Sequence, residues 1–277
     1  MLSAKVARPT ARYAQTAEES VRGRTPMTTA DNLAKAASFL SASKRLAVLT
    51  GAGVSKESGI PTFREAQTGL WAQYDPETLA TPEGFLKDPT LVWRWYDSRR
   101  QKLAEVAPNE GHRALVELEA FIGDLTIITQ NVDGLHAQAG SARVIELHGN
   151  ISKLKCFEHN HPAKDIPLGL NEPPLCACGS LIRPDVVWFG EALPQSELSR
   201  AMQISQQVDL MLVIGTSGLV HPAASLPYLA KQNRARILEV NPNRTPITEI
   251  ADLFLQGPSA EILPTIISLL KKAKVNS

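Results

Sequence analysis

Residues 45–59 read RLAVLTGAGVSKESG, and this stretch decides the fold of the chain. Arg45–Thr50 is a short apolar run that ends at Gly51, which indicates a buried strand followed by a tight turn. Glycines directly after such a strand let the backbone approach a pyrophosphate. The third glycine is displaced to Gly59, so the G-x-G-x-x-G fingerprint of hydride-transferring dehydrogenases is not met.

Similar apolar runs and helical patterns alternate along the rest of the chain. The further runs are residues 125–129, 144–147, 210–214, 237–240 and 253–255. The helical patterns are residues 31–40, 111–121, 197–207, 223–232 and 261–272. Strands that alternate with helices predict a doubly wound parallel α/β sheet, of the Rossmann-like kind, covered on both faces.

Two stretches interrupt this alternation. Residues 64–108 combine tryptophans with spaced prolines and predict a smaller helical module. Residues 152–186 contain all three cysteines and little apolar periodicity. An insert so poor in apolar residues needs another source of stability, and a bound metal would supply it.

Composition excludes several classes of protein. Lys and Arg total 29 against 28 Asp and Glu, so nothing points to nucleic acid as a partner. No apolar run approaches the roughly 20 residues that span a bilayer, and no heptad repeat favours an oligomer over a monomer. Residues 1–27 begin with a basic, acid-free leader that is typical of a mitochondrial transit peptide. The alternative is an untargeted disordered tail on a cytoplasmic or nuclear protein.

Several motifs together resemble one known family. Residues 51–64, GAGVSKESGIPTFR, resemble the first signature of the sirtuins, the NAD-dependent protein lysine deacylases. The later signatures follow in family order as TQNVDGLH at 129–136, LHG at 147–149, VVWFGE at 186–191, GTS at 215–217 with VHP at 220–222, and Asn241. The chain is identified as a member of this family, with a catalytic domain over residues 28–277.

The resemblance implies a reaction and a set of residues for it. Sirtuins transfer the acyl group of an acyl-lysine in a protein to ADP-ribose, releasing nicotinamide and O-acyl-ADP-ribose. His148 would be the catalytic base, and Asn131 would bind the ribose and position a water. The NAD-binding positions would be Gly51, Ala52, Gly53, Ser55, Phe63, Arg64, Gln130, Asn131, Val132, Asp133, Gly215, Thr216, Ser217, Asn241 and Ser259. Without the other motifs, a structural role would be the better explanation of His148. An Asx-turn cap would explain Asn131 or Asp133, but not both together with Gln130.

A second pattern bears on the acyl group. Tyr96 and Arg99 are three residues apart, so they share one face of a predicted helix. Aimed into a pocket they would together bind a carboxylate, although spacing alone favours a surface arginine beside a packed tyrosine. The pair resembles the class III sirtuins, sirtuin-5-like enzymes that remove succinyl, malonyl and glutaryl groups and deacetylate weakly. Ala80 would leave room for the longer acyl chain. Val187, Trp188, Phe189 and Gly190 resemble the segment that pairs with the substrate backbone, although an ordinary edge strand is the alternative.

The cysteines predict one structural zinc ion. The family uses two cysteine pairs, and here the ligands would be Cys156, His159, Cys176 and Cys178, with His161 as the alternative fourth ligand. A metal-free insert with three free thiols is the competing interpretation.

Other functions are compatible with the same fold. They are a plain deacetylase, a mono-ADP-ribosyltransferase and a non-catalytic NAD-binding protein. Tyr96 and Arg99 argue against the first, and intact His148 and Asn131 argue against the last.

Overall fold

A computed structural model describes residues 29–61, 79–164 and 166–275 of the chain. Its centre is a six-stranded sheet whose paired strands all run parallel, in the order β3-β2-β1-β7-β8-β9. The strands are β1 (Arg45–Thr50), β2 (Asp124–Thr129), β3 (Val144–Glu146), β7 (Leu210–Ile214), β8 (Arg236–Asn241) and β9 (Leu253–Gln256). The predicted doubly wound α/β fold is therefore confirmed.

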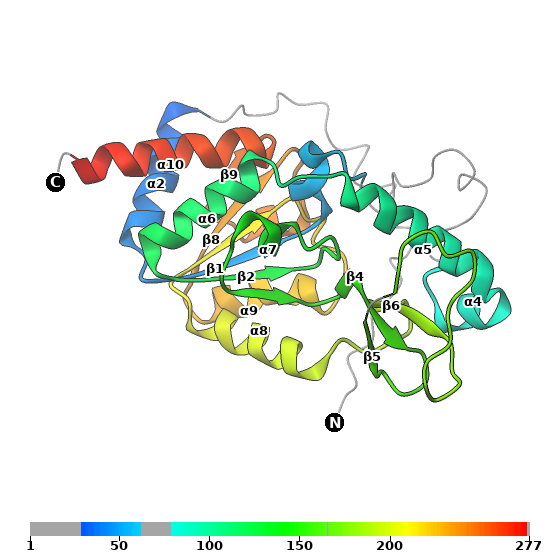
Figure 1. Cartoon of the computed structure of the whole chain (residues 1–277). Helices are drawn as coiled ribbons and strands as arrows, with labels where there is room; N and C mark the ends of the chain where they lie inside the picture. The colour runs from blue at the N-terminus through cyan, green and yellow to red at the C-terminus, as the bar shows by residue number, and fades with distance from the viewer. Residues whose placement is uncertain (1–28, 62–78, 165, 276–277) are drawn as a thin grey trace, which may run out of the picture.

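Helices cover both faces of this sheet (Figure 1). One layer contains α2 (Ala30–Ala42), α6 (Glu110–Ile122) and α10 (Ser259–Val275), and the other contains α8 (Gln195–Gln207) and α9 (Leu226–Gln232). The alternation of side chains along β1 produces the two cores: Leu46 and Val48 join the first, whereas Ala47 and Leu49 join the second. A strand buried on both faces reads as a continuous apolar run, which is why the sequence reveals it.

The chain changes direction across the sheet between β1 and β7. It builds β2 and β3 on one side of β1 and then returns to build β7, β8 and β9 on the other. Ligands of doubly wound folds bind in the crevice at the carboxyl ends of the strands on either side of such a switch point. Gly51 follows β1 and Gly215 follows β7, so the glycine-rich turn lies at this position.

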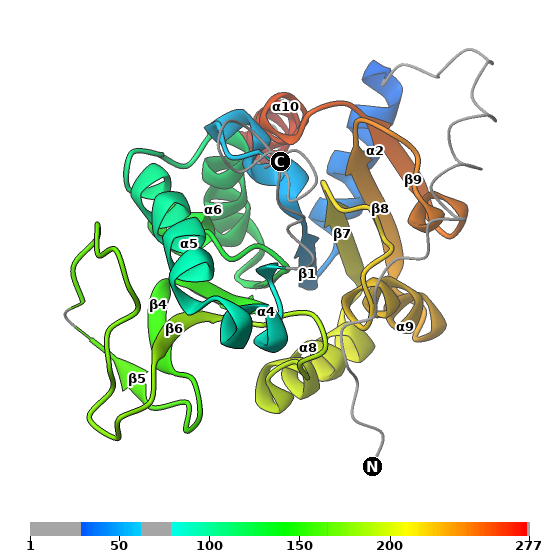
Figure 2. The ribbon, with the colours of Figure 1, turned by 90° about the vertical axis from the view of Figure 1, so that its right-hand side faces the viewer.

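A second, smaller part of the molecule stands beside the sheet, as Figure 2 shows. Two helices, α4 (Pro82–Lys87) and α5 (Pro89–Ala104), pack near a three-stranded antiparallel sheet. That sheet consists of β4 (Gly149–Cys156), β5 (Pro162–Ala163) and β6 (Ile182–Val186). The sequence did not predict these strands, because the register between β4 and β6 shifts between Asn150 and Leu154 and interrupts the period of two.

Polar contacts join α5 to the insert. The carboxylate of Asp97 accepts a hydrogen bond from the backbone of Gly169 at 2.8 Å. The indole of Trp93 and the guanidinium of Arg94 donate to the carbonyls of Leu170 and Asn171, each at 2.9 Å. The helical module and the insert are thus fastened to each other at several points.

No helix of the described residues is long and apolar enough to cross a membrane.

Candidate active site

The glycine-rich turn packs tightly against the turn that follows β7. The backbone N–H of Gly53 donates to the carbonyl of Gly215 at 2.8 Å. A Cβ at Gly53 would lie 2.7 Å from the Cα of Gly215, and one at Gly215 would lie 2.6 Å from the backbone nitrogen of Val54. The glycines therefore let the two loops meet at the carboxyl ends of β1 and β7.

Residues at the carboxyl ends of three strands are hydrogen-bonded to one another. Gln130, after β2, donates from Nε2 to the hydroxyl of Thr216 at 2.9 Å. Asn241, at the end of β8, donates from Nδ2 to the carbonyl of Thr216 at 2.7 Å. Three residues that the sequence predicts to bind NAD are thereby gathered at the switch point.

A second group lies between the turn and the loop after β2. Asn131 donates from Nδ2 to the hydroxyl of Ser55 at 3.1 Å, and Ser55 donates to the carboxylate of Asp133 at 2.7 Å. The other carboxylate oxygen of Asp133 accepts from the backbone of Leu135 at 2.9 Å. Burial raises the pKa of Asp133, while these hydrogen bonds act in the opposite direction.

His148 has the geometry of a general base. Its Nδ1 lies 2.9 Å from the carbonyl oxygen of Gln130, and a carbonyl can only accept. Nδ1 therefore carries the proton, and Nε2 presents a free lone pair. Nε2 is buried and has no hydrogen-bond partner among the described residues. Burial lowers the pKa of the ring below its usual value of about 6.5, so the imidazole is neutral near pH 7. A substrate hydroxyl beside Nε2 would satisfy this orphaned atom.

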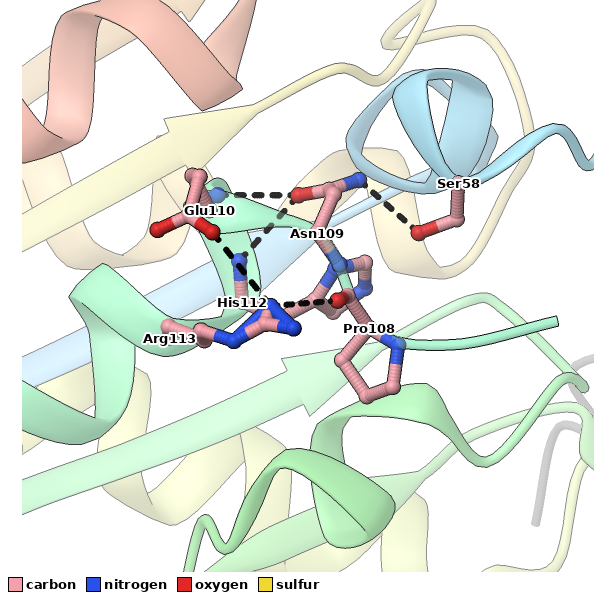
Figure 3. Close-up of polar contacts among 7 residues, drawn as sticks. Ser58, Pro108, Asn109, Glu110, His112 and Arg113 are labelled. Atoms are coloured by element: carbon pink, nitrogen blue, oxygen red, sulfur yellow. Dashed lines mark hydrogen bonds and ion pairs between the residues drawn. The ribbon is translucent and has the colours of Figure 1, made fainter.

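A further layer of buried and partly buried polar residues, to which the sequence pattern assigned no role, supports these groups. Asn109, at the start of α6, donates from Nδ2 to the hydroxyl of Ser58 at 3.0 Å (Figure 3) and to the carbonyl of Val54. It thereby fixes the turn that carries Ser55. Thr50 bridges the hydroxyl of Thr129 and the ring of His136. Short-range patterns give no signal for this layer, because its members meet only in the fold.

The remaining NAD positions are less closely joined. Ala52 and Val132 are partly buried, and Ser217 is exposed. Ser259 begins α10, and its buried hydroxyl has no partner among the described residues. Phe63 and Arg64, like residues 1–27, lie outside the described residues. Their roles stay predictions.

The predicted acyl pocket lies at the other end of the site, around α5. Tyr96 is buried, and its oxygen accepts a hydrogen bond from the indole nitrogen of Trp188 at 2.9 Å. Arg99 is partly buried, and its guanidinium lies 5.0 Å from the centre of the Trp95 ring. No carboxylate of the described residues pairs with Arg99. Burial raises the pKa of Tyr96 to about 12, while the charge of Arg99 acts in the opposite direction. Burial lowers the pKa of Arg99, and Tyr96 acts in the opposite direction.

The segment after β6 runs past this pocket without forming a strand of its own. Val187 donates from its backbone to the carbonyl of His148 at 2.8 Å, and Phe189 to that of Ala80 at 2.9 Å. Val187 and Phe189 are partly buried and Gly190 is exposed, whereas the side chain of Trp188 is fully buried. The structure therefore places the Trp188 side chain in the wall behind Tyr96 and not on an accessible surface.

The insert brings four metal-ligand side chains together. The ligand atoms of Cys156, His161, Cys176 and Cys178 all lie within 4.8 Å of one another. The sulfurs of Cys156 and Cys178 are 3.5 Å apart, close to the roughly 3.8 Å that a tetrahedral zinc with 2.3 Å bonds would set. Three thiolates and one imidazole suit structural zinc. Of the two histidines, His161 is the one in this cluster, because the turn after β4 brings its Nδ1 to 3.8 Å from the sulfur of Cys176. His159 is exposed, and its backbone N–H lies 3.5 Å from the sulfur of Cys156. Its role as a ligand stays a prediction.

Comparison with known proteins agrees with this geometry. Residues 51–222 match the model of the Sir2 family. The chain is 51% identical over 229 residues to an NAD-dependent protein deacylase of Aquifex aeolicus, covering 82% of this chain and 95% of the relative. A crystal structure of a Sir2 homologue in complex with NAD is 45% identical, with a TM-score of 0.83 and coverage of 90% of this chain and 97% of that one. A structure of Sir2Af2 bound to a myristoylated histone peptide is 34% identical, with a TM-score of 0.72 and coverage of 90% and 100%.

The chain therefore belongs to the Sir2 family, the sirtuins, and is an NAD-dependent protein deacylase. NAD is its cosubstrate, and the cysteine and histidine cluster fits a structural zinc.

Proposed function

We propose that this deacylase prefers acidic acyl groups, namely succinyl, malonyl and glutaryl, on the lysines of proteins. The proposal concerns only the acyl group, because the family and the use of NAD follow from the comparisons. It rests on the polar groups around α5.

The cofactor end of the site supports an acyl transfer. Bound NAD supplies the electrophilic ribose carbon and the hydroxyl that finally accepts the acyl group. Asn131, Ser55 and Asp133 hold one another at the loop where the nicotinamide ribose would lie. His148 is set to remove a proton from that hydroxyl through Nε2, while the carbonyl of Gln130 fixes its tautomer.

The observation that carries the proposal is that Arg99 is partly buried and has no anionic partner among the described residues. A cation taken partly out of water without an anionic partner is costly, and the stacking on Trp95 offsets only part of that cost. The carboxylate of a succinyl-lysine would supply the missing partner, as a charge-assisted and geometrically selective contact. An acetyl group would leave Arg99 as it is. In a plain deacetylase, the acyl group would give Arg99 no anionic partner.

The test compares succinyl-lysine and acetyl-lysine versions of one peptide, with and without NAD, by mass spectrometry of the peptide and of O-acyl-ADP-ribose. We expect faster removal of succinyl by the wild type and no turnover of either peptide by H148A. R99M should reduce desuccinylation by roughly 100-fold relative to deacetylation, the magnitude of a lost contact between charged groups. Equal losses on both peptides would refute the acidic-acyl preference.

A further inference from the structure

A chain of buried contacts stands behind Tyr96. Arg183, on β6, is 2% exposed and binds both carboxylate oxygens of Glu191, at 2.5 and 3.0 Å. Its guanidinium also lies 3.2 Å from the centre of the Trp188 ring. The same Glu191 accepts the backbone N–H of Trp188 at 2.8 Å. Trp188 is thus held at its backbone by one partner and across its ring by the other.

This arrangement fixes the direction of one hydrogen bond. An indole nitrogen can only donate, so the oxygen of Tyr96 is the acceptor in the 2.9 Å contact with Trp188. The hydroxyl proton of Tyr96 must then point elsewhere. No acceptor for it is present among the described residues, and Arg99 is the charge with the largest effect on the pKa of the phenol.

We propose that Trp188, clamped by Arg183 and Glu191, is a positioning residue for acyl selection, because its indole N–H directs the Tyr96 hydroxyl proton toward the acyl carboxylate. The inference rests on the acidic-acyl preference proposed above. Without the indole N–H, the phenol oxygen would need a donor. Arg183 is bound to Glu191, so Arg99, the cation with the largest effect on the phenol, would provide one. Tyr96 and Arg99 would then satisfy each other, and the carboxylate would lose both of its partners.

The packing explains why this device needs a clamp. Tyr96 and Trp188 belong to one apolar cluster with Phe85 and Trp95, so the side chains around the phenol are largely apolar. The rings of Phe85 and Trp188 are 5.3 Å apart at an angle of 45°. A cation over the indole face adds attraction in a water-poor setting and holds the ring plane in place.

A double-mutant cycle tests the inference. Wild type, W188F, Y96F and W188F/Y96F are compared by the ratio of kcat/KM for the succinyl-lysine peptide to that for the acetyl-lysine peptide. The ratio cancels any general loss of folded or NAD-competent enzyme. Each single variant should lower it roughly 10-fold, the usual effect of one hydrogen bond to a charged group. The double variant should be no worse than Y96F alone, because Trp188 acts only through the Tyr96 hydroxyl.

A second variant separates the hydrogen bond from the packing. Replacing Trp188 with 3-benzothienylalanine keeps the bicyclic ring and exchanges its N–H for sulfur. We expect the same fall in the ratio as in W188F, together with an unchanged melting temperature. This control remains informative if W188F folds poorly.

The outcomes distinguish the two proposals. A wild type that does not remove succinyl would overturn the acidic-acyl preference and this inference with it. Desuccinylation that depends on Arg99, with an unchanged ratio in the benzothienyl variant, would overturn the inference alone. Losses that multiply in W188F/Y96F would also overturn it, since they would show that Trp188 acts by a route other than Tyr96.

Discussion

The polar side chains of the Ser55, Asn131 and Asp133 group at the cofactor end and those at the acyl end differ in how far they are paired. At the cofactor end, Ser55, Asn131 and Asp133 are hydrogen-bonded to one another. At the acyl end, the Tyr96 hydroxyl proton and the Arg99 cation have no acceptor or anion among the described residues.

The difference follows from what each end must recognise. Every turnover uses the same NAD, so its site gains from being held in one geometry in advance. The acyl group is the variable part of the reaction, and selection requires polar groups that are satisfied only by the right substrate. The comparison therefore separates a preorganised half of the site from a selective half.

The largest expected effect breaks the support of the selective half. Asp97 is buried with Arg100 at 3.2 Å and also accepts from Gln101 and Gly169. D97A should cost about 3–5 kcal/mol in unfolding free energy, because it leaves the guanidinium buried without its partner. Urea denaturation followed by circular dichroism measures this.

A matched pair on the large sheet provides the control for Asp97. Asp124 and Arg143 are also ion-paired, at 3.0 Å, but both side chains are about half exposed. D124A should cost no more than about 1 kcal/mol. Equal costs for the two variants would contradict the role of Asp97 in fastening the helical module to the insert.

The next effect tests the metal centre that stabilises the insert. H161A should weaken zinc binding by at least about 100-fold, beyond the range seen when only a ligand's partner is changed. H159A is the matched control, since its ring stacks on that of His161 at 5.2 Å without joining the ligand cluster. Zinc content after dialysis against a chelator of graded strength measures both. Loss of zinc from H159A and not from H161A would reverse the ligand assignment.

The last prediction concerns His112 and His136, two buried histidines whose rings lie 4.9 Å apart. Burial lowers the pKa of His112 to about 4 and that of His136 to about 3, whereas a histidine in the unfolded chain titrates near 6.5. The contribution of the two neutral rings to the free energy of unfolding is therefore fully present above pH 6.5. That stability is lost as the pH falls toward these values, at about 1.4 kcal/mol per pH unit for each ring.

Urea unfolding at a series of pH values from 7 to 5 gives this slope. H136N removes one of the two titrating rings, so its stability should fall less steeply with acid than that of the wild type. Identical slopes would show that His136 does not titrate as its burial requires.

The sequence predicted those features of the fold that depend on residues close together in the chain. The runs that became β1, β2 and β7 are buried on both faces, so their apolar character is continuous and easily read. The site motifs that follow β1, β2, β7 and β8 lie at the strand ends, so their approximate position followed once the sheet was parallel. Residue spacing alone also placed Tyr96 and Arg99 on one helix face.

The sequence did not predict those features that depend on contacts between segments distant in the chain. His159 and His161 have equal chemical claims as ligands, and only the course of the chain after β4 brings His161 to Cys176. The irregular register of β4 concealed a three-stranded sheet. Asn109 meets Val54 and Ser58 more than fifty positions away, and no spacing rule could have joined them.

The sequence by itself determined the doubly wound fold, the Sir2 family signatures and the residues from which the site is made, because strand burial, glycine turns and helix spacing are short-range properties. The tertiary structure decided which partner each of those residues has. It determined which histidine joins the metal cluster, which nitrogen of His148 presents its lone pair, and that Trp188 donates to the oxygen of Tyr96. Hydrogen-bond direction depends on the partner that folding supplies, and that partner is seldom a neighbour in the chain.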